Sequence, residues 1–393
     1  SNPKASTIWY VNTKLYLPRY GYNTTSNVIE INNDDDLKTA LTFGYKDKIY
    51  KINKNYKFID VATGNAVPSS PLYVELAEIT LANNGGGSSG RFFDRGVEIS
   101  FTEIPYKVTI ENTDINLSSC VFFANSVVSV NVTLLAASDS SNYNGMYNNL
   151  SGCNFTNIKF NINATKRVGL AGGKSGIGTS HNEGYLGLFA NNTSGCNFTN
   201  CEIIINIPDT IQLISYDNNT LNVSTYGHIF GRAYRSSFTN CKLQVNGGST
   251  IVSDKDTIAN AGGIIGNLLY SNIDGISYKI GSVDYQITSN KDTISLGGFA
   301  GISQGSVIGA LTATDENITA TVTKGASSSN IYIGGVFGKV AIDGSSFANS
   351  KFNKIRITGV SIINATGVTK NAKIVGIGAI VGSSSGVGYS DVD

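Results

Sequence analysis

Residues 226–247 read YGHIFGRAYRSSFTNCKLQVNG, and this stretch decides the fold because variants of it recur along the chain. The hexapeptide GCNFTN occurs twice, at 152–157 and at 195–200. Further copies begin at Ser271, Gly305 and Ser345. A repeat of this length points to an array of similar structural units, each packed on its neighbours, rather than to one irregular globular core.

Each copy follows a short block of glycine and apolar residues, such as GGIIG at 262–266. Glycine there lets the backbone bend or lets a neighbouring strand approach closely. The block, the SSFTN-like segment and an alternating segment such as KLQVN predict three short strands, followed by a loop of variable length. Each copy has one central apolar residue, and these central residues are 34 to 43 positions apart. They are Phe155, Phe198, Phe238, Ile273, Val307 and Phe347.

These units predict an all-β fold, a single right-handed parallel β-helix with three short strands per coil. One coil cannot bury its apolar face, whereas coils stacked at about 4.8 Å bury a continuous core. We expect the apolar centres to point inward and stack. The Asn of FTN (Asn157, Asn200, Asn240 and Asn349) suits a left-handed turn and a hydrogen-bonded ladder. A β-sandwich is the competing fold, but it would need regular hairpin turns and no recurring glycine block.

The segment before the repeats predicts the start of the helix. Residues 1–62 contain an expected strand at Val28–Ile31 and then an acidic N-cap at 34–36. Asp36, Leu37, Ala40 and Leu41 fit a short amphipathic helix that caps the apolar stack, and alternating strand follows. Residues 63–110 read as early coils with a glycine-rich insertion, and residues 111–393 as the repeat-built β-helix, with the strongest copies at 184–393.

The glycine block followed by Asn-Cys and a β-strand resembles the GLUG repeat, and the opening segment resembles right-handed β-helices of the pectate-lyase-like superfamily. The GLUG resemblance covers residues 184–393, with a weaker copy at 146–163; the later copies lose the Cys. GLUG-type repeats occur mainly in large secreted or surface-anchored bacterial proteins, including adhesins. The resemblance therefore implies an extracellular or cell-surface location, with a virion surface as an alternative.

Composition excludes some classes of partner. The chain has 393 residues, 15% of them charged, with a net charge of +1, so it has no basic field for nucleic acid. The longest weakly polar stretch, residues 373–382, is too short and glycine-rich to cross a bilayer as a helix. Five cysteines in so long a chain do not form a disulfide scaffold. Cys153 and Cys196 share one repeat position and Cys201 and Cys241 another, which fits small buried residues stacked between coils, although disulfides between coils remain geometrically possible.

No sequence motif indicates a cofactor or a metal site. The glycine-rich run at 169–178 has Val168 where a phosphate-binding loop needs its first glycine. The triplet at 181–183 resembles half of a zinc deaminase signature, but the Pro-Cys-x-x-Cys half is missing. We therefore expect no cofactor, no metal and no assigned catalytic residue.

Tyrosines give the best indication of binding. Tyr185, Tyr216, Tyr226 and Tyr234 lie in or beside the variable loops, and exposed Tyr with Asn and Ser suits recognition of glycans or proteins. We expect a non-enzymatic, adhesin-like surface protein or a fibre-forming structural protein, with ligand on the loop face and with self-association or fibre assembly possible. A virion spike or filament subunit is a variant of this class.

The alternative is a polysaccharide-cleaving β-helix enzyme of the hydrolase or lyase type, which needs paired carboxylates. Most acidic residues, Asp315 and Glu316 among them, are expected in loops. Glu202 and Asp274 stand out within strands, and we expect both to point outward into solvent.

Overall fold

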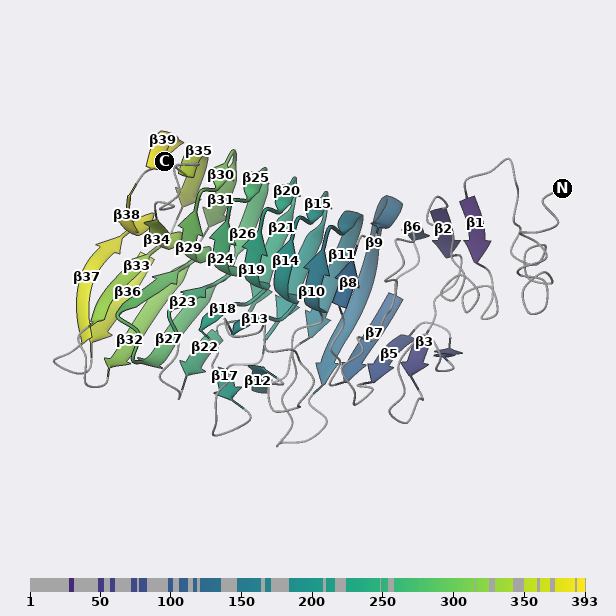
Figure 1. The fold of residues 1–393 in the computed structure, drawn as a ribbon, viewed down its shortest axis with the longest axis horizontal. Helices are drawn as coiled ribbons and strands as arrows, with labels where there is room; N and C mark the ends of the chain where they lie inside the picture. Colours follow the sequence, from purple (N-terminus) through teal and green to yellow (C-terminus); the bar gives the residue numbers. More distant parts are fainter. Residues whose placement is uncertain are drawn as a thin grey trace.

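The computed structural model describes the backbone of 28–31, 49–52, 57–60, 72–75, 78–82, 98–101, 106–111, 116–118, 121–135, 147–163, 167–170, 184–207, 210–215, 224–247, 249–253, 258–314, 316–324, 329–341, 350–358, 361–367, 372–385 and 387–392, with most side chains from Tyr147 on. These residues form a parallel β-solenoid (Figure 1). Successive coils are stacked along the long axis, and the described part of the chain contains no helix. The all-β repeat fold is thereby confirmed.

The strands form four sheets, which we name A to D. Sheet A comprises β1 (Val28–Ile31), β2 (Ile49–Ile52), β3 (Lys57–Asp60), β4 (Leu72–Glu75), β5 (Glu78–Ala82), β6 (Glu98–Phe101), β7 (Tyr106–Glu111), β9 (Val121–Leu135), β11 (Asn154–Asn163), β15 (Asn197–Thr199), β16 (Glu202–Asn206), β20 (Ser237–Thr239), β21 (Lys242–Asn246), β25 (Asn272–Asp274), β26 (Ile276–Lys279), β30 (Val307–Ile308), β31 (Leu311–Thr314), β35 (Ser350–Thr358) and β39 (Val387–Val392). Sheet B comprises β8 (Asn116–Ser118), β10 (Tyr147–Ser151), β14 (Ala190–Ser194), β19 (Phe230–Tyr234), β24 (Ile265–Leu269), β29 (Ala300–Gln304), β34 (Phe337–Ala341) and β38 (Val381–Ser384).

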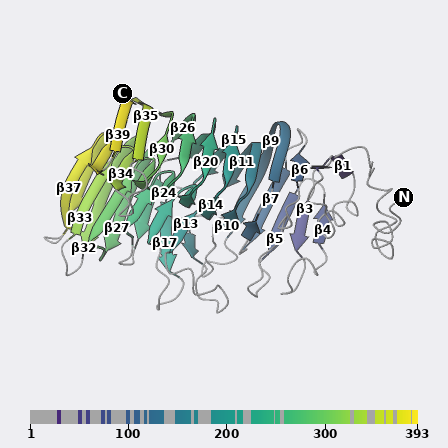
Figure 2. The same cartoon turned by 45° about the horizontal axis from the view of Figure 1, so that its top comes forward.

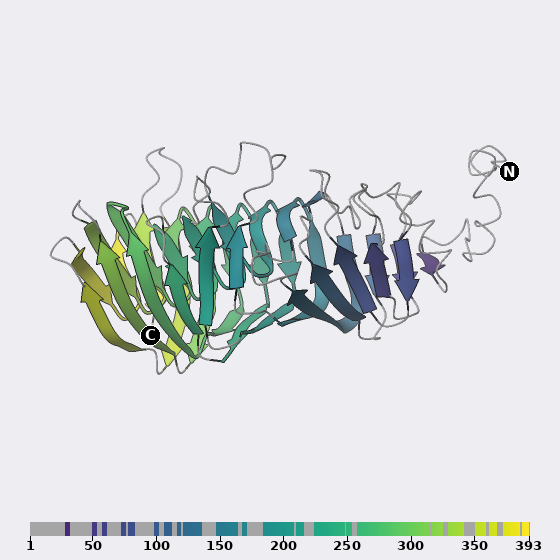
Figure 3. The same ribbon diagram turned by 90° about the horizontal axis from the view of Figure 1, so that it is seen from below.

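The other two sheets have six strands each. Sheet C comprises β12 (Arg167–Leu170), β17 (Thr210–Ser215), β22 (Ser249–Ser253), β27 (Ser282–Ser289), β32 (Asn317–Lys324) and β36 (Ser361–Gly367). Sheet D comprises β13 (Tyr185–Gly187), β18 (Thr225–Gly227), β23 (Asn260–Gly262), β28 (Thr293–Gly297), β33 (Ser329–Gly334) and β37 (Ala372–Gly378). In Figures 2 and 3 the strands of each sheet lie side by side across the long axis.

One coil is more finely divided than the three strands predicted. From β18 the chain passes through β19, then β20 and β21, then β22, so five short strands visit sheets D, B, A and C in turn. One extra strand comes from a bend that divides the predicted glycine-block strand into β18 and β19, and the other, β22, lies where a variable loop was predicted. The expected strand at Val28–Ile31 is confirmed as β1. The expected capping helix at Asp36, Leu37, Ala40 and Leu41 lies outside the described residues, and the right-handed sense of coiling stays a prediction.

The core is a set of in-register ladders. Phe155 pairs with Phe198 and Phe198 with Phe238, and their rings stack at 4.9 and 5.0 Å with interplanar angles of 1° and 4°. Ile273 continues this ladder. All four side chains are buried, which confirms the inward stack over these coils.

One member of the ladder, Val307, was assigned wrongly. Val307 is 42% exposed and pairs with Asn272, whereas Ile308 is buried and pairs with Ile273. One residue of shift moves a side chain to the opposite face of a strand. Phe347 lies outside the described residues, and Phe352 holds the corresponding backbone position beside Ile308.

Two turns recur in left-handed conformation. Within sheet A, Asn157, Asn200 and Asn240 have φ of 60°, 52° and 52°, which confirms their predicted turn role. The corresponding residue of the next coil is Gly275, with φ of 77°. Between sheets B and A, the recurring positions with positive φ are Gly152, Gly195, Arg235, Tyr270 and Gly305. The predicted turn asparagine Asn349 lies outside the described residues.

A buried polar ladder follows the second turn. The N–H of Cys153 donates to Cys196 Sγ at 3.4 Å, and the N–H of Cys196 donates to Ser236 Oγ at 3.2 Å. Ser271 and Ser306 extend the same pattern at 3.2 Å per step. Side chains thus satisfy backbone donors that a buried turn would otherwise leave without partners.

Candidate functional site

Three tyrosines and two arginines gather on and beside sheet B, with Tyr185 on sheet D at one border and Arg235 and Tyr270 in the turns to sheet A at the other. Arg232 and Tyr234 are two residues apart on β19, so they project from the same face of the strand. The Arg232 guanidinium carbon lies 5.1 Å from the Tyr185 ring centroid and 4.7 Å from that of Tyr234. Arg235 lies 5.1 Å from the Tyr234 ring. Tyr270 meets Tyr234 edge to face at 5.8 Å. We name these five residues the Tyr/Arg cluster.

Glycine brings the two sheets close enough for this contact. A Cβ on Gly231 would lie 2.6 Å from Leu186 N and from Asn191 O, so only glycine fits beside the neighbouring backbone. The same crowding recurs at Gly227, whose added Cβ would lie 2.2 Å from Phe230 O. The glycine block therefore makes the close approach predicted for it, and Tyr185 of one coil reaches Arg232 of the next.

Sheet B carries cations but no acid in its strands. Arg232 and Lys339 are its charged strand residues, and none of the eight strands contains Asp or Glu. Lys339 lies 5.6 Å from the Tyr332 ring of sheet D, a further cation–π pair along the solenoid. The cluster thus lies on a sheet whose strands favour anions over cations.

The four predicted binding tyrosines do not form one surface. Tyr185 and Tyr234 do lie together, on either side of Arg232. Tyr226 has 0% exposure in the core, so its placement beside surface loops was wrong. All three residues of β18 are buried, and Tyr226 pairs with Leu186 and Ala261 of the adjacent coils. Tyr216 lies outside the described residues.

Arg232, Arg235 and Tyr270 were missed from the sequence. A period of two from Tyr234 would have placed Arg232 on the same strand face. Tyr270 could have been found by aligning the turn before each SSFTN-like segment, because it occupies the repeat position of Arg235.

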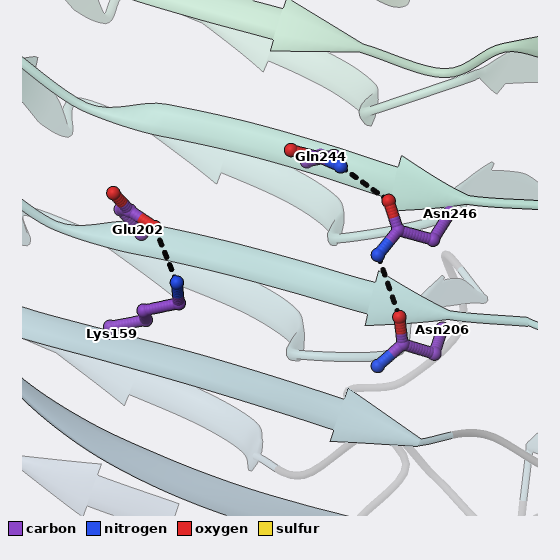
Figure 4. A network of polar contacts seen from close by, with 5 residues as sticks. All are labelled: Lys159, Glu202, Asn206, Gln244 and Asn246. Carbon is purple, nitrogen blue, oxygen red and sulfur yellow. Dashed lines mark hydrogen bonds and ion pairs between the residues drawn. The ribbon is translucent and has the colours of Figure 1, made fainter.

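A shallow polar pocket lies on the outer face of sheet A. Its volume is about 440 Å³, and residues of four consecutive coils line it, among them Asn200, Glu202, Asn240, Lys242 and Thr312. Figure 4 shows the neighbouring side chains. Glu202 pairs with Lys159 at 3.2 Å, Asn246 donates to Asn206 at 2.8 Å, and Gln244 bonds to Asn246.

Glu202 is the pocket's single carboxylate and is partly exposed. Asp274 is exposed on β25, outside the pocket lining. Both acids project outward, as expected. Glycoside cleavage needs two carboxyl groups flanking the bond. The pocket lining therefore offers one carboxylate to a bound molecule rather than a pair.

Glu316 was expected in a loop and is instead 0% exposed inside the solenoid. Burial raises the pKa of its carboxyl to about 8, although the Ile280 N–H, 3.1 Å from Oε1, and the nearby Tyr278 act in the opposite direction. A protonated carboxyl avoids the larger free-energy cost of burying a charge. Burial also lowers the pKa of His228 to about 4; its Nδ1 lies 2.8 Å from Gly263 O and its Nε2 3.1 Å from Ser249 Oγ.

The four described cysteines are buried free thiols. Hydrogen bonding to Cys153 and burial raise the pKa of Cys196 well above its ordinary value, and burial raises that of Cys201 to about 12. Raised pKa values disfavour the reactive thiolate. These cysteines fit the predicted role of small stacked core residues.

Among the described residues, no three His, Cys, Asp or Glu side chains converge as a metal site. No helix of that part of the chain has the length and apolar character to span a membrane. In comparisons with known proteins, no family model, no curated protein and no solved structure matches the chain.

Proposed function

We propose that the chain is a non-enzymatic, adhesin-like binding module and that glycans bind on the outer face of sheet B around the Tyr/Arg cluster. The observation that supports this proposal most directly is the grouping of Tyr185, Arg232 and Tyr234 on the stacked strands. Tyrosine offers a large apolar face and a hydroxyl with little rotamer freedom to lose, and Tyr and Arg dominate binding hot spots.

The scaffold itself supports this role. Each cluster residue extends from a strand or a tight turn held by hydrogen bonds to adjacent coils, and Ala233, beside Tyr234 on β19, is buried. A site built on such elements loses little conformational entropy when it binds. Binding on these elements replaces the loop face proposed from the sequence.

The finer assignments belong to the same proposal. The right-handed sense of the helix, GLUG-type repeat identity and an extracellular or cell-surface location follow from the sequence resemblance. A fibre-forming protein, virion spike or filament subunit is a variant of the proposed class, since each exposes a long solenoid surface.

A glycan-array screen run beside a reducing-sugar release assay tests the proposal. We expect binding without sugar release, and loss of binding in Tyr234→Ala. Gln244→Ala, on the outer face of sheet A, is the matched control and should bind like the parent protein. Sugar release that is abolished by Glu202→Ala would instead support the polysaccharide-cleaving enzyme, and unchanged binding in Tyr234→Ala would place the ligand elsewhere.

A further inference from the structure

Arg235 and Tyr270 occupy backbone conformations that side chains rarely adopt. Their φ values are 48° and 50°, at a turn where other coils have Gly152, Gly195 and Gly305. Glycine adopts this conformation without steric cost, whereas arginine and tyrosine adopt it at the expense of stability. Two adjacent coils therefore carry bulky residues where the fold itself is better served by glycine.

Neither side chain is buried in the core, so core packing does not explain the bulky residue at this turn. Arg235 is exposed and Tyr270 is half-buried. Both converge on Tyr234, at 5.1 Å and 5.8 Å from its ring. Gln304 of the next coil donates to the Tyr270 hydroxyl at 3.4 Å. Backbone strain retained at a surface cluster is a recognised mark of a functional site.

The chemistry of the cluster selects an anionic ligand. Guanidinium groups match the geometry of a carboxylate and bind it through paired, charge-assisted hydrogen bonds. Arg232 and Arg235 both lie against Tyr234, on a sheet whose strands contain no Asp or Glu. Tyrosine rings add flat apolar faces and hydroxyls suited to a sugar ring. Cations and aromatic rings side by side fit a sugar that bears a carboxylate better than a neutral one.

We propose that the Tyr/Arg cluster binds carboxylate-bearing glycans, with Arg235 and Arg232 holding the carboxylate and Tyr234 and Tyr270 contacting the sugar. This inference rests on the proposed glycan-binding function and specifies its substrate class. The inference also explains why the turn carries Arg235 and Tyr270 rather than glycine. Glycine at these positions would relieve the backbone strain but would remove side chains that form the binding site.

The test is calorimetric binding of an oligouronate and of its carboxyl-reduced, neutral counterpart to the whole chain. We expect the oligouronate to bind at least about tenfold more tightly, and Arg235→Gly to weaken its binding by about tenfold or more. Arg235→Gly should melt no lower than the parent, since it installs the residue that other coils use, so lost binding cannot be attributed to misfolding. Lys279→Ala, which removes an exposed cation from sheet A, is the matched control and should bind like the parent.

The outcomes separate this inference from the function on which it rests. Equal binding of the two oligosaccharides, lost in Tyr234→Ala, would overturn the acidic specificity and leave the glycan-binding function standing. Oligouronate binding unchanged by Arg235→Gly would overturn the assigned site. Absence of binding to these oligosaccharides and to every glycan on the array would overturn both.

Discussion

At the scale of single residues, the glycines between sheets D and B are fixed by backbone crowding. A Cβ added to Gly227 would lie 2.2 Å from the carbonyl oxygen of Phe230 in its own coil and 2.4 Å from the nitrogen of Gly266 in the next. Gly195 is required for a different reason, its φ of 63°, and has open space around it. Crowding forbids any side chain, whereas a positive φ tolerates asparagine.

Gly227→Ala should therefore lower the free energy of unfolding by about 1–3 kcal/mol, because its methyl group must displace backbone. Gly195→Asn, at an open left-handed position, should change it by less than about 0.5 kcal/mol. Chemical denaturation of both variants measures the difference. Equal destabilisation would show that the corner is not packed as described.

The role of these glycines was predictable because their spacing repeats. The environment of Glu316 was not, because one acidic residue beside Asp315 is indistinguishable in sequence from a solvated loop. Only the stacking of β26, β27 and β28 around it creates the buried site. The same limit applies to Tyr226, whose burial depends on neighbouring coils.

Glu316 should make stability depend on pH. Its carboxyl has a pKa of about 8 in the folded chain against an ordinary 4.5, so between these values the folded state binds more protons than the unfolded state. Its stabilising contribution is full below pH 4.5 and falls as pH rises, with a limiting slope of about 1.4 kcal/mol per pH unit, until it levels off above pH 8.

Glu316→Gln should remove this dependence and leave a chain that is more stable than the parent at pH 8. Unfolding free energies of parent and variant at pH 5, 6.5 and 8 measure this difference in pH dependence. Above pH 6.5, protonation of His228 on unfolding no longer contributes to the slope. Parallel pH profiles for parent and variant would contradict the buried neutral carboxyl.

At the scale of elements, each strand contributes one inward residue to a ladder. The Phe155, Phe198 and Phe238 stack followed from the repeat because FTN marks the same turn in every copy. The predicted register is wrong at Val307. The copy GSVIGALTAT contains two adjacent apolar residues, and nothing in its sequence favours Ile308 over Val307 as the inward one. Two of the five strands of a coil were also missed, because a bend at 228–229 divides the glycine block into β18 and β19, and because the sheet C strand β22 lies in the segment that reads as a variable loop.

Phe238→Ala should lower the free energy of unfolding by about 3–5 kcal/mol, since it leaves a cavity between Phe198 and Ile273. Thr239→Ala, one residue along on the outward face, should cost less than about 0.5 kcal/mol. Denaturant midpoints at constant slope give both values. A cost for Phe238→Ala as small as that of Thr239→Ala would reject the ladder.

At the scale of the whole molecule, the solenoid is a sum of coils that touch only their neighbours. Sheets A, B, C and D each gain strands as coils are added, and the first and last described strands, β1 and β39, lie toward opposite ends of the long axis (Figure 1). Length, repeat and parallel stacking were all evident in the sequence. The cluster on sheet B was not, because it joins residues from three coils whose alignment emerges only from the register.

Removal of one coil tests the stacked register most directly. Deleting residues 226–260 removes one coil and joins Thr225 to Ala261. Ala261 pairs with Tyr226 in the parent chain, so it takes the place of Tyr226 and every later strand stacks in register on the preceding coil. Deleting residues 226–259 instead shifts that register by one residue and reverses the faces of the strands that follow. We predict that the first deletion retains the parent's β-sheet circular dichroism and unfolds cooperatively, while the second does not. Loss of cooperative folding in the first, or equal behaviour of the two, would contradict the account.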